Sequence, residues 1–253
     1  MDIVIIGSGN VATVLGRKFK TAGHHIVQVA GRNAAAASAL AYEWNTMSTN
    51  YLSAINRNAE FYIIAVTDVA IADVVRELKL PGKIVAHTAA SVPKEVLKNV
   101  TEHYGVFYPL QSLSKDMKNL PDMPIFFDGS DDLTKRKLET LAHSIAKVKV
   151  AEAGNDERLK LHVAAVFVSN FVNHLYSLAE DYCRKEGLDF KQLLPLIEET
   201  ASRIKDISPK QTQTGPALRH DRETIHKHLE LLKDHPQLKN VYVLLTESIQ
   251  QVK

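Results

Sequence analysis

Residues 3–12 read IVIIGSGNVA, and this stretch decides how the first half of the chain folds. An apolar run typical of a buried strand ends at Gly7, and a segment with helical character follows Gly9. The first glycine permits a tight turn, the second lets a pyrophosphate approach the backbone, and Ala12 permits close packing of helix on strand. Phosphates would sit at the helix N-terminus, where unpaired amides and the helix dipole favour negative charge. We interpret the stretch as the start of a dinucleotide-binding unit; the alternative is an ordinary glycine turn.

The end of the second predicted strand, residues 25–30, indicates which dinucleotide is bound. NAD-binding chains place a ribose-binding carboxylate near this position, but here the sequence has Gly31, Arg32 and Asn33. A guanidinium suits a 2′-phosphate because it makes charge-assisted and potentially bidentate hydrogen bonds. We therefore predict NADP as the cofactor, held by Arg32 with Asn33 or Ser38 as a helper. The alternative is a solvated arginine after a strand.

Composition bounds the class of protein. A chain of 253 residues can form one large domain or two moderate ones. Its 31 basic and 29 acidic residues are dispersed and leave a net charge of +2, so nothing favours binding to nucleic acid or to a membrane. The single Cys183 forms no internal disulfide, and the N-terminal apolar run is too short for a signal peptide or a membrane span. A cytoplasmic location is expected.

The remaining pattern alternates strand and helix and then becomes helical throughout. This alternation predicts an α/β fold with a doubly wound, Rossmann-type, mostly parallel sheet. Further strands are expected over residues 61–66, 83–88, 105–110, 124–128 and 147–151, with helices over 69–79, 92–102 and 133–146. Helices alone are expected over 155–187, over 190–205 with a bend near Pro195, after Asp221 and after Pro236. We predict a Rossmann domain over 1–152 and a helical substrate and dimerisation domain over 153–253.

Polar loops follow three of the predicted strands. Ligands of doubly wound sheets lie across the carboxyl ends of the strands, so these loops are candidates for cofactor and substrate contacts. The alternative for each loop is that its polar groups cap local structure. The residues expected to hold the cofactor are Gly7, Ser8, Gly9, Asn10, Val11, Arg32, Asn33, Val66, Thr67 and Thr88. The residues expected to contact the substrate in these loops are His87, Ser91 and Gln111.

The first long helix carries few polar residues. Between residues 161 and 172 they are His162, Ser169 and Asn170, and a helix that is apolar nearly all round is expected to be buried. At 100° per residue, His162 and Ser169 fall on one stripe with Asn173. We predict His162, Ser169 and Asn170 as catalytic residues that bind and protonate a carbonyl or an imine. The alternative is pairing of these groups with neighbouring helices or a second subunit.

A last polar cluster spans residues 214–221. Asp221 is expected to cap the helix that follows it, and Arg219 is expected to bind an anionic group of the substrate. The histidines at 226 and 228 point in different directions on a helix. We predict no metal site.

Together these motifs resemble proteins that join a Rossmann-like NADP-binding domain to a helical C-terminal domain of unknown function. The motifs that carry the resemblance are residues 7–12, 87–91, 108–112, 162–171 and 214–221. More distantly the layout resembles pyrroline-5-carboxylate reductases, deazaflavin-dependent NADP reductases, ketopantoate reductases and the 6-phosphogluconate dehydrogenase C-terminal-like superfamily. The resemblance implies a homodimer formed through the helical domain, which closes the substrate site in those relatives. The layout also resembles the 3-hydroxyisobutyrate dehydrogenase class, with two departures. That class has an asparagine one turn after the lysine of its first long helix, where Ala164 follows Lys160 here, and Ala89-Ala90 lacks the glycine of the His-Thr-Ser-Gly version of its loop.

The sequence thus predicts an NADP-dependent oxidoreductase. It would transfer a hydride between NADP(H) and a small carbonyl or imine compound bound in the cleft between the two domains. The nicotinamide carries the hydride, so the protein need only orient the substrate and supply a proton. The alternative is a non-catalytic NADP-binding sensor or a structural dimer, because fold alone does not decide function.

Overall fold

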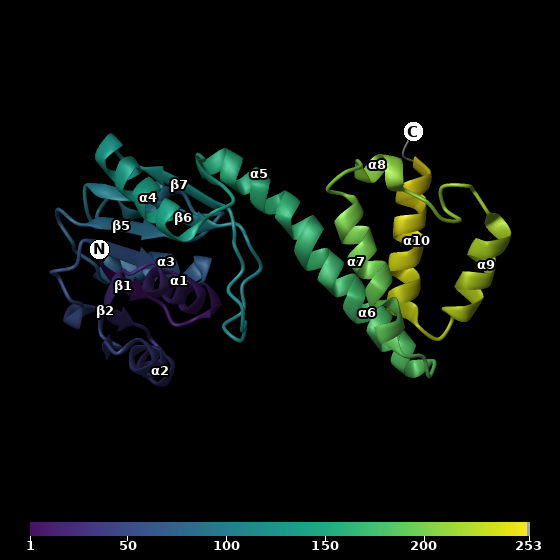
Figure 1. Ribbon diagram of the computed structural model, residues 1–253, viewed down its shortest axis with the longest axis horizontal. Helices are drawn as coiled ribbons and strands as arrows, with labels where there is room; N and C mark the ends of the chain where they lie inside the picture. Colours follow the sequence, from purple (N-terminus) through teal and green to yellow (C-terminus); the bar gives the residue numbers. More distant parts are fainter. Residues whose placement is uncertain (252–253) are drawn as a thin grey trace. The chain divides into compact units, whose positions relative to one another are not determined.

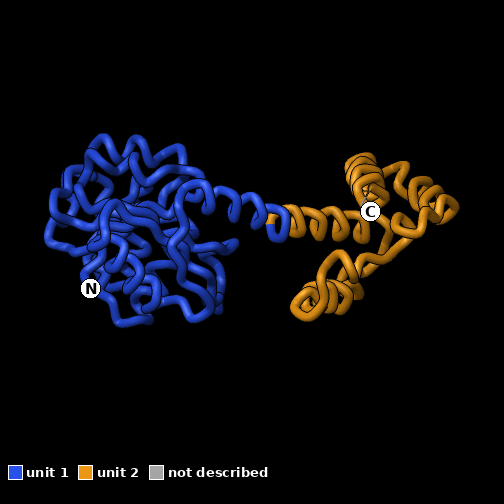
Figure 2. The backbone as a smooth tube through the Cα atoms, turned by 90° about the horizontal axis from the view of Figure 1, so that it is seen from above, with its two compact units in different colours: residues 1–169 blue, residues 170–253 orange. Residues whose placement is uncertain are grey.

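The computed structural model describes residues 1–251 and divides the chain into two compact units. The first unit comprises residues 1–169 and the second residues 170–253 (Figure 2). Residues 252 and 253, the end of the predicted helical domain, lie outside the described residues. The predicted boundary at residue 152 stays a prediction: the last strand ends at Glu152, and the first unit continues along a helix to Ser169.

The first unit is built on an eight-stranded sheet with strand order β3-β2-β1-β4-β5-β6-β7-β8. The pair β6–β7 is antiparallel and every other pair is parallel. Its first six strands follow the order of a doubly wound dinucleotide-binding sheet, which confirms the predicted fold class. The strands are β1 (Asp2–Ile6), β2 (His25–Ala30), β3 (Met47–Thr49), β4 (Phe61–Ile64), β5 (Ile84–His87), β6 (His103–Pro109), β7 (Ile125–Gly129) and β8 (Val150–Glu152).

Helices cover both faces of this sheet (Figure 1). Successive strand residues point to opposite faces, so Ile3 and Ile5 pack with one set of helices, whereas Val4 and Ile6 pack with the other. The first face carries α1 (Asn10–Thr21), α2 (Ala34–Trp44) and α4 (Asp132–Ile145). The second face carries α3 (Asp68–Glu77) and the 3₁₀ turns η1 (Leu52–Ala54) and η2 (Lys94–Leu97). The helix expected over 92–102 is only the short η2, and β3 was not expected.

The long helix expected over 155–187 is interrupted. It consists of α5 (Asn155–Ala165), a six-residue π-helix η3 (Val166–Phe171) and α6 (Val172–Lys185). A π-turn contains more residues than an α-turn, so the assumed 100° per residue does not hold across η3. The helix stops before Gly187 (φ +71°), as predicted.

The second unit consists of helices throughout its described part. After α6 come η4 (Phe190–Leu193), α7 (Leu194–Arg203), α8 (Pro209–Thr212), α9 (Arg222–Leu231) and α10 (Pro236–Gln251). The helix predicted over 190–205 is divided just before Pro195 into η4 and α7, and the bend near Pro195 stays a prediction. Pro195 lies in the first turn of α7, where its missing N–H costs no hydrogen bond. The Asp221 side chain caps α9 by accepting a hydrogen bond from the Thr224 amide at 3.0 Å, as predicted.

The prediction that residues 161–172 are buried is wrong within this chain. Val163 is 52% exposed and Val168 is 75% exposed. Leu161 is the last hydrophobic residue of α5 that packs on the apolar cluster around Tyr108. In the described part of the second unit, the buried hydrophobic residues are Cys183, Ala217 and Leu232. So small a buried set provides little of the core on which helix packing depends.

Candidate functional site

The glycine turn after β1 is shaped by close backbone contacts. Gly7 has φ +131°, and a Cβ there would lie 2.2 Å from the Ala65 carbonyl oxygen, so only glycine fits. Its amide donates to the Ala30 carbonyl at 2.7 Å and fixes the turn against β2. Gly9 differs, because a Cβ on it would meet no atom within 4 Å. Gly9 is also the N-cap of α1 and supplies no side-chain cap, so the first-turn amides are left for another acceptor.

A cavity of about 370 Å³ opens at this turn. It lies at the carboxyl ends of β1, β2 and β4, where the strand order reverses, the usual ligand position in a doubly wound sheet. Its volume is within the range of small-ligand pockets. Seven predicted cofactor residues line it: Gly7, Ser8, Gly9, Arg32, Asn33, Val66 and Thr67. Apolar side chains that include Leu52, Ala70 and Val74 line it as well.

Three other predicted cofactor residues do not line this cavity. The Asn10 side chain accepts a hydrogen bond from the Lys115 amide at 3.1 Å and so holds the loop after β6 against α1. Val11 packs on the core between α1 and the sheet. Thr88 is 8% exposed, and its amide bonds the Ile64 carbonyl, which ties β5 to β4. The contacts of these three residues are explained by packing of the core and by anchoring of a loop.

Arg32 and Asn33 play different parts at the rim. Arg32 is exposed and lines the cavity at the end of β2. Asn33 is the N-cap of α2, and its Oδ1 accepts a hydrogen bond from the Ala36 amide at 3.0 Å. That bond occupies the Asn33 carbonyl oxygen, so its first role is local. Arg32 is therefore the cation that this rim presents.

A second polar cluster lies at the carboxyl ends of β4, β5 and β6. The Ser91 hydroxyl donates to the Asp68 carboxylate across the ends of β4 and β5. The Tyr108 hydroxyl lies 3.0 Å from Nδ1 of His162, which α5 brings over the end of β6. One turn beyond α5, Ser169 shares a hydrogen bond of 2.6 Å with Ser112. The structure thus brings together the predicted residues Ser91, His162 and Ser169 at one edge of the sheet.

His87 lies beneath this cluster. Its side chain is 0% exposed, and Nδ1 accepts a hydrogen bond from the Ala89 amide at 3.2 Å. Burial, aided by the charge of Arg158, lowers the pKa of His87 to about 4, while the nearby Pro93 carbonyl opposes this shift. His87 is therefore neutral at physiological pH and holds its own loop. The structure does not place it at a surface where a substrate could touch it.

Arg158 also lies at this edge of the sheet, and it was not predicted from the sequence as a site residue. It is 1% exposed, and its guanidinium donates to the Ala90 and Val92 carbonyls at 3.1 and 2.8 Å and to the Asn155 side chain at 2.9 Å. These bonds fasten α5 to the loop after β5. A charged residue near a helix start gives no sequence signal of burial, because such positions are ordinarily solvated. Tyr108 was also missed, although its motif was noted, because its reach toward α5 depends on tertiary packing.

The other predicted site residues lie apart from these contacts. The Gln111 side chain is exposed and accepts a hydrogen bond from the Ser112 amide, closing its own turn. Asn170 is the first residue of the second unit and is exposed. Arg219 is exposed in the second unit. The pKa of Asp221 is lowered mainly by hydrogen bonds from Thr224 and to a smaller extent by the charge of Arg219. Substrate contacts by Gln111 and Arg219 and a catalytic role for Asn170 stay predictions.

Two family models together match nearly all of the chain. One is described as a Rossmann-like domain and matches residues 1–111. The other is described as a domain of unknown function, DUF2520, and matches residues 123–249. The chain belongs to the DUF2520 family. This membership confirms the resemblance expected from the motifs in both halves of the sequence.

Solved structures share the fold of this DUF2520 protein. The "putative NADP oxidoreductase BF3122" of Bacteroides fragilis is 38% identical, with 99% of this chain and 98% of that chain covered and a TM-score of 0.93. A reductive aminase from Aspergillus terreus, in complex with NADPH and ethyl-5-oxohexanoate, is 17% identical, with 99% and 92% covered and a TM-score of 0.71. A 1-pyrroline-5-carboxylate reductase from Streptococcus pyogenes is 14% identical, with 100% and 99% covered and a TM-score of 0.64. No curated protein matches the chain.

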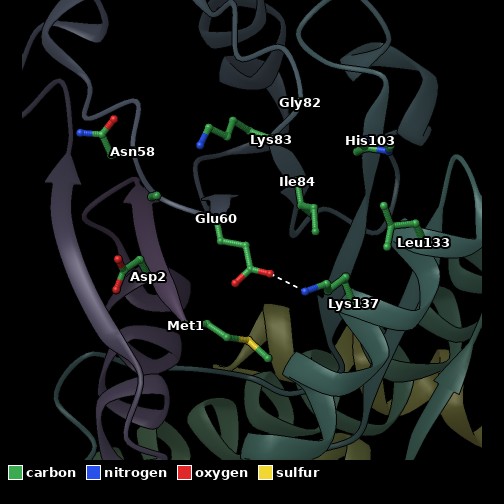
Figure 3. A pocket seen from close by; sticks show the side chains of 11 residues that line it. Met1, Asp2, Asn58, Glu60, Gly82, Lys83, Ile84, His103, Leu133 and Lys137 are labelled. Atoms are coloured by element: carbon green, nitrogen blue, oxygen red, sulfur yellow. Dashed lines mark hydrogen bonds and ion pairs between the residues drawn. The ribbon is translucent and has the colours of Figure 1, made fainter.

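Another hollow of the DUF2520 protein lies at the opposite edge of its sheet (Figure 3). It is lined by residues at the amino ends of four strands, among them Asp2, Glu60, Ile84 and His103. Lys137 and Glu60 form an ion pair of 2.7 Å inside it. Ligands of doubly wound sheets bind at the carboxyl edge, so we place the candidate site at the glycine turn and not here.

Residues 1–251 of the DUF2520 protein contain neither a metal-binding cluster nor a membrane-spanning helix. No group of three or more His, Cys, Asp or Glu side chains in that range could hold a metal ion. No helix in the same range has both the length and the apolar character that a membrane span requires.

Proposed function

We propose that this protein is an NADP-dependent oxidoreductase that transfers a hydride between NADP(H) and a small carbonyl or imine compound. The observation that carries the proposal is the cavity at the switch point of the sheet, where the glycine turn, the uncapped start of α1 and Arg32 meet. Those features fit a pyrophosphate and a 2′-phosphate. The reductive aminase of similar fold, which is in complex with NADPH, supports this choice of cofactor.

The chain's own residues would divide the work as follows. The nicotinamide supplies the hydride when the cofactor is bound. Gly7, Gly9 and Arg32 bind the cofactor, whereas His162 donates a proton to the oxygen or nitrogen of the substrate. Ser169, which is tied to Ser112, orients the substrate beside His162.

We expect Arg32→Ala to weaken NADPH binding about 10-fold to 100-fold and to leave NADH binding unchanged. Charge-assisted hydrogen bonds to a phosphate contribute roughly 1.5–3 kcal/mol, and NADH lacks that phosphate. Calorimetric titration with both cofactors measures the two affinities. Arg136→Ala, which removes an exposed arginine from α4, is the matched control and should change neither. An unchanged ratio of NADPH to NADH affinity in the Arg32 variant would remove Arg32 from the phosphate site.

A screen of NADPH oxidation against carbonyl and imine compounds tests the reaction itself. Turnover with a member of either class supports the oxidoreductase. Tight NADPH binding without turnover across both classes would instead favour the non-catalytic sensor.

We also propose that a second copy of this chain covers the apolar surface of the second unit. The large apolar side chains exposed there include Leu188, Leu194, Leu196, Ile204, Ile207, Leu231, Leu244 and Leu245. Isolated apolar residues on a surface are normal, but a unit with so few buried residues needs a partner surface to be stable.

We expect a mass twice the chain's 28.1 kDa by light scattering at micromolar concentration. Leu196→Glu should shift this mass toward the monomer, because it would bury a charge in the interface. Tyr42→Glu, which changes a side chain on α2 that is 91% exposed, should leave the mass unchanged. A monomeric mass for the unsubstituted protein would contradict the proposed dimer.

A further inference from the structure

The contact between Tyr108 and His162 joins the sheet to α5 through two groups that can exchange a proton. The phenol oxygen and Nδ1 are 3.0 Å apart, and the two rings meet edge to face at 73°. Tyr108 is 7% exposed at the end of β6, whereas His162 is partly exposed. Within residues 1–251, the Nε2 atom of His162 has no hydrogen-bond partner.

The direction of this hydrogen bond depends on the tautomer of His162. Burial raises the pKa of Tyr108, the charge of Asp68 adds to this rise, and the charge of Arg158 opposes it. At neutral pH the phenol therefore keeps its proton and is able to donate it to Nδ1. A neutral imidazole that accepts at Nδ1 carries its own proton at Nε2.

Arg158 supplies a buried positive charge beside this pair. It stands one helical turn before His162 on α5, and its charge acts on Tyr108. Its Nη1 atom is buried without a hydrogen-bond partner among the described residues. An unsatisfied buried donor is costly, so a negative charge that formed on a neighbouring group would be stabilised there.

We propose that Tyr108 and His162 form a two-step proton relay in which Tyr108 fixes the Nε2–H form of His162 and Arg158 stabilises the phenolate that results. The tautomer part does not depend on the proposed function, whereas the relay rests on it. Tyr108 and Arg158 are thus positioning residues that act through His162.

The proton balance of the relay is closed. As the hydride of NADPH reaches the substrate carbon, the substrate oxygen or nitrogen takes the Nε2 proton of His162. Nδ1 then takes the phenolic proton of Tyr108, so the imidazole stays neutral and the negative charge comes to rest on the phenolate beside Arg158. After the product leaves, a proton from solvent adds to Nε2 and the Nδ1 proton returns to the phenolate, which restores the starting state.

The tautomer can be tested without cofactor or substrate. We expect ¹⁵N chemical shifts of the imidazole at neutral pH to show the Nε2–H form of His162 in the unsubstituted protein. The signal is assigned by its loss in His162→Gln. In Tyr108→Phe we expect a mixture of tautomers, because no donor then holds Nδ1. An Nδ1–H form in the unsubstituted protein, or the same tautomer in the Phe variant, overturns the proposal whether or not the protein reduces any substrate.

The relay is tested by kinetics with a substrate found in the screen. We expect Tyr108→Phe to lower kcat about 100-fold and to leave NADPH affinity unchanged, since a positioned proton donor contributes roughly 100-fold or more. Tyr62→Phe is the matched control: Tyr62 is 0% exposed and its hydroxyl donates to the Asn56 carbonyl at 2.7 Å, away from His162. Equal kcat in the two variants overturns the relay.

Arg158 is tested by a pair of substitutions. Arg158→Lys keeps the positive charge, whereas Arg158→Met removes it, and both disturb the bonds to the Ala90 and Val92 carbonyls. We expect the Lys variant to retain a higher kcat than the Met variant at equal thermal stability. Equal loss in both would make Arg158 a loop anchor and exclude it from the relay.

Discussion

Gly9→Ala is expected to leave the protein folded while weakening NADPH binding by about 10-fold to 100-fold. Its backbone is extended (φ −90°, ψ −169°), a conformation open to alanine, and a Cβ there would meet no protein atom within 4 Å. That empty space is where the pyrophosphate would approach the start of α1. A methyl group in a filled contact costs about 1–3 kcal/mol, which corresponds to this loss of affinity. Calorimetric titration and a thermal melt measure the two effects.

Two other glycines make this experiment decisive. Gly154 is the N-cap of α5, and a Cβ on it also meets nothing within 4 Å, so Gly154→Ala makes the same chemical change away from the cavity. We expect it to leave NADPH affinity unchanged. Gly7→Ala should instead destabilise the fold, because its Cβ would collide with the Ala65 carbonyl at 2.2 Å. If Gly9→Ala bound NADPH as tightly as Gly154→Ala, no cofactor phosphate would contact Gly9.

His162→Gln is expected to lower kcat about 100-fold or more on a carbonyl or imine substrate without changing NADPH affinity. Glutamine retains an amide oxygen that can accept the Tyr108 hydrogen bond, so α5 should keep its position. The glutamine amide is not acidic enough to protonate a substrate at neutral pH, and a general acid contributes roughly 100-fold to 10,000-fold. Steady-state kinetics at saturating NADPH measure the effect.

His143→Gln is the control for this substitution. His143 is exposed in the last turn of α4, outside the polar cluster, and its replacement should leave kcat unchanged. Full turnover by His162→Gln would exclude His162 as the acid. It would also leave the NADPH cavity intact as a binding site, because no part of that cavity depends on His162.

The fold could be predicted because its signals are local. The apolar run at 3–6 and the strand at 25–30 lie where the sequence placed them, and Gly187 and Asp221 act as the predicted stop and cap. Non-local effects set the rest. The strand β3 has only three residues, and it is extended because it pairs with β2. The π-helix cannot be inferred from the sequence, because the extra residue in each of its turns needs no particular residue type.

The candidate site was predicted in part for the same reason. The glycine pattern predicts the shape of the turn directly, so most of the predicted cofactor residues do line the cavity. The burial of His87 and Arg158 could not be predicted from the sequence. Arginine is mostly exposed in proteins, and histidine is intermediate between the buried and the exposed types. Tyr108 contacts His162, 54 residues later in the chain, only because β6 and α5 pack together.

The reversed strand β7 decides where the long helix leads. A strand running parallel to β6 would finish at the carboxyl edge, and the next helix would start there and travel away from it. Because β7 opposes β6 and β8 follows β7, the chain leaves the sheet heading the other way and must turn back. Its return path passes Ala90, then Tyr108 and then Ser112, so Arg158, His162 and Ser169 meet the edge in chain order. One change of strand direction thus brings a connecting helix back to the carboxyl ends of β5 and β6.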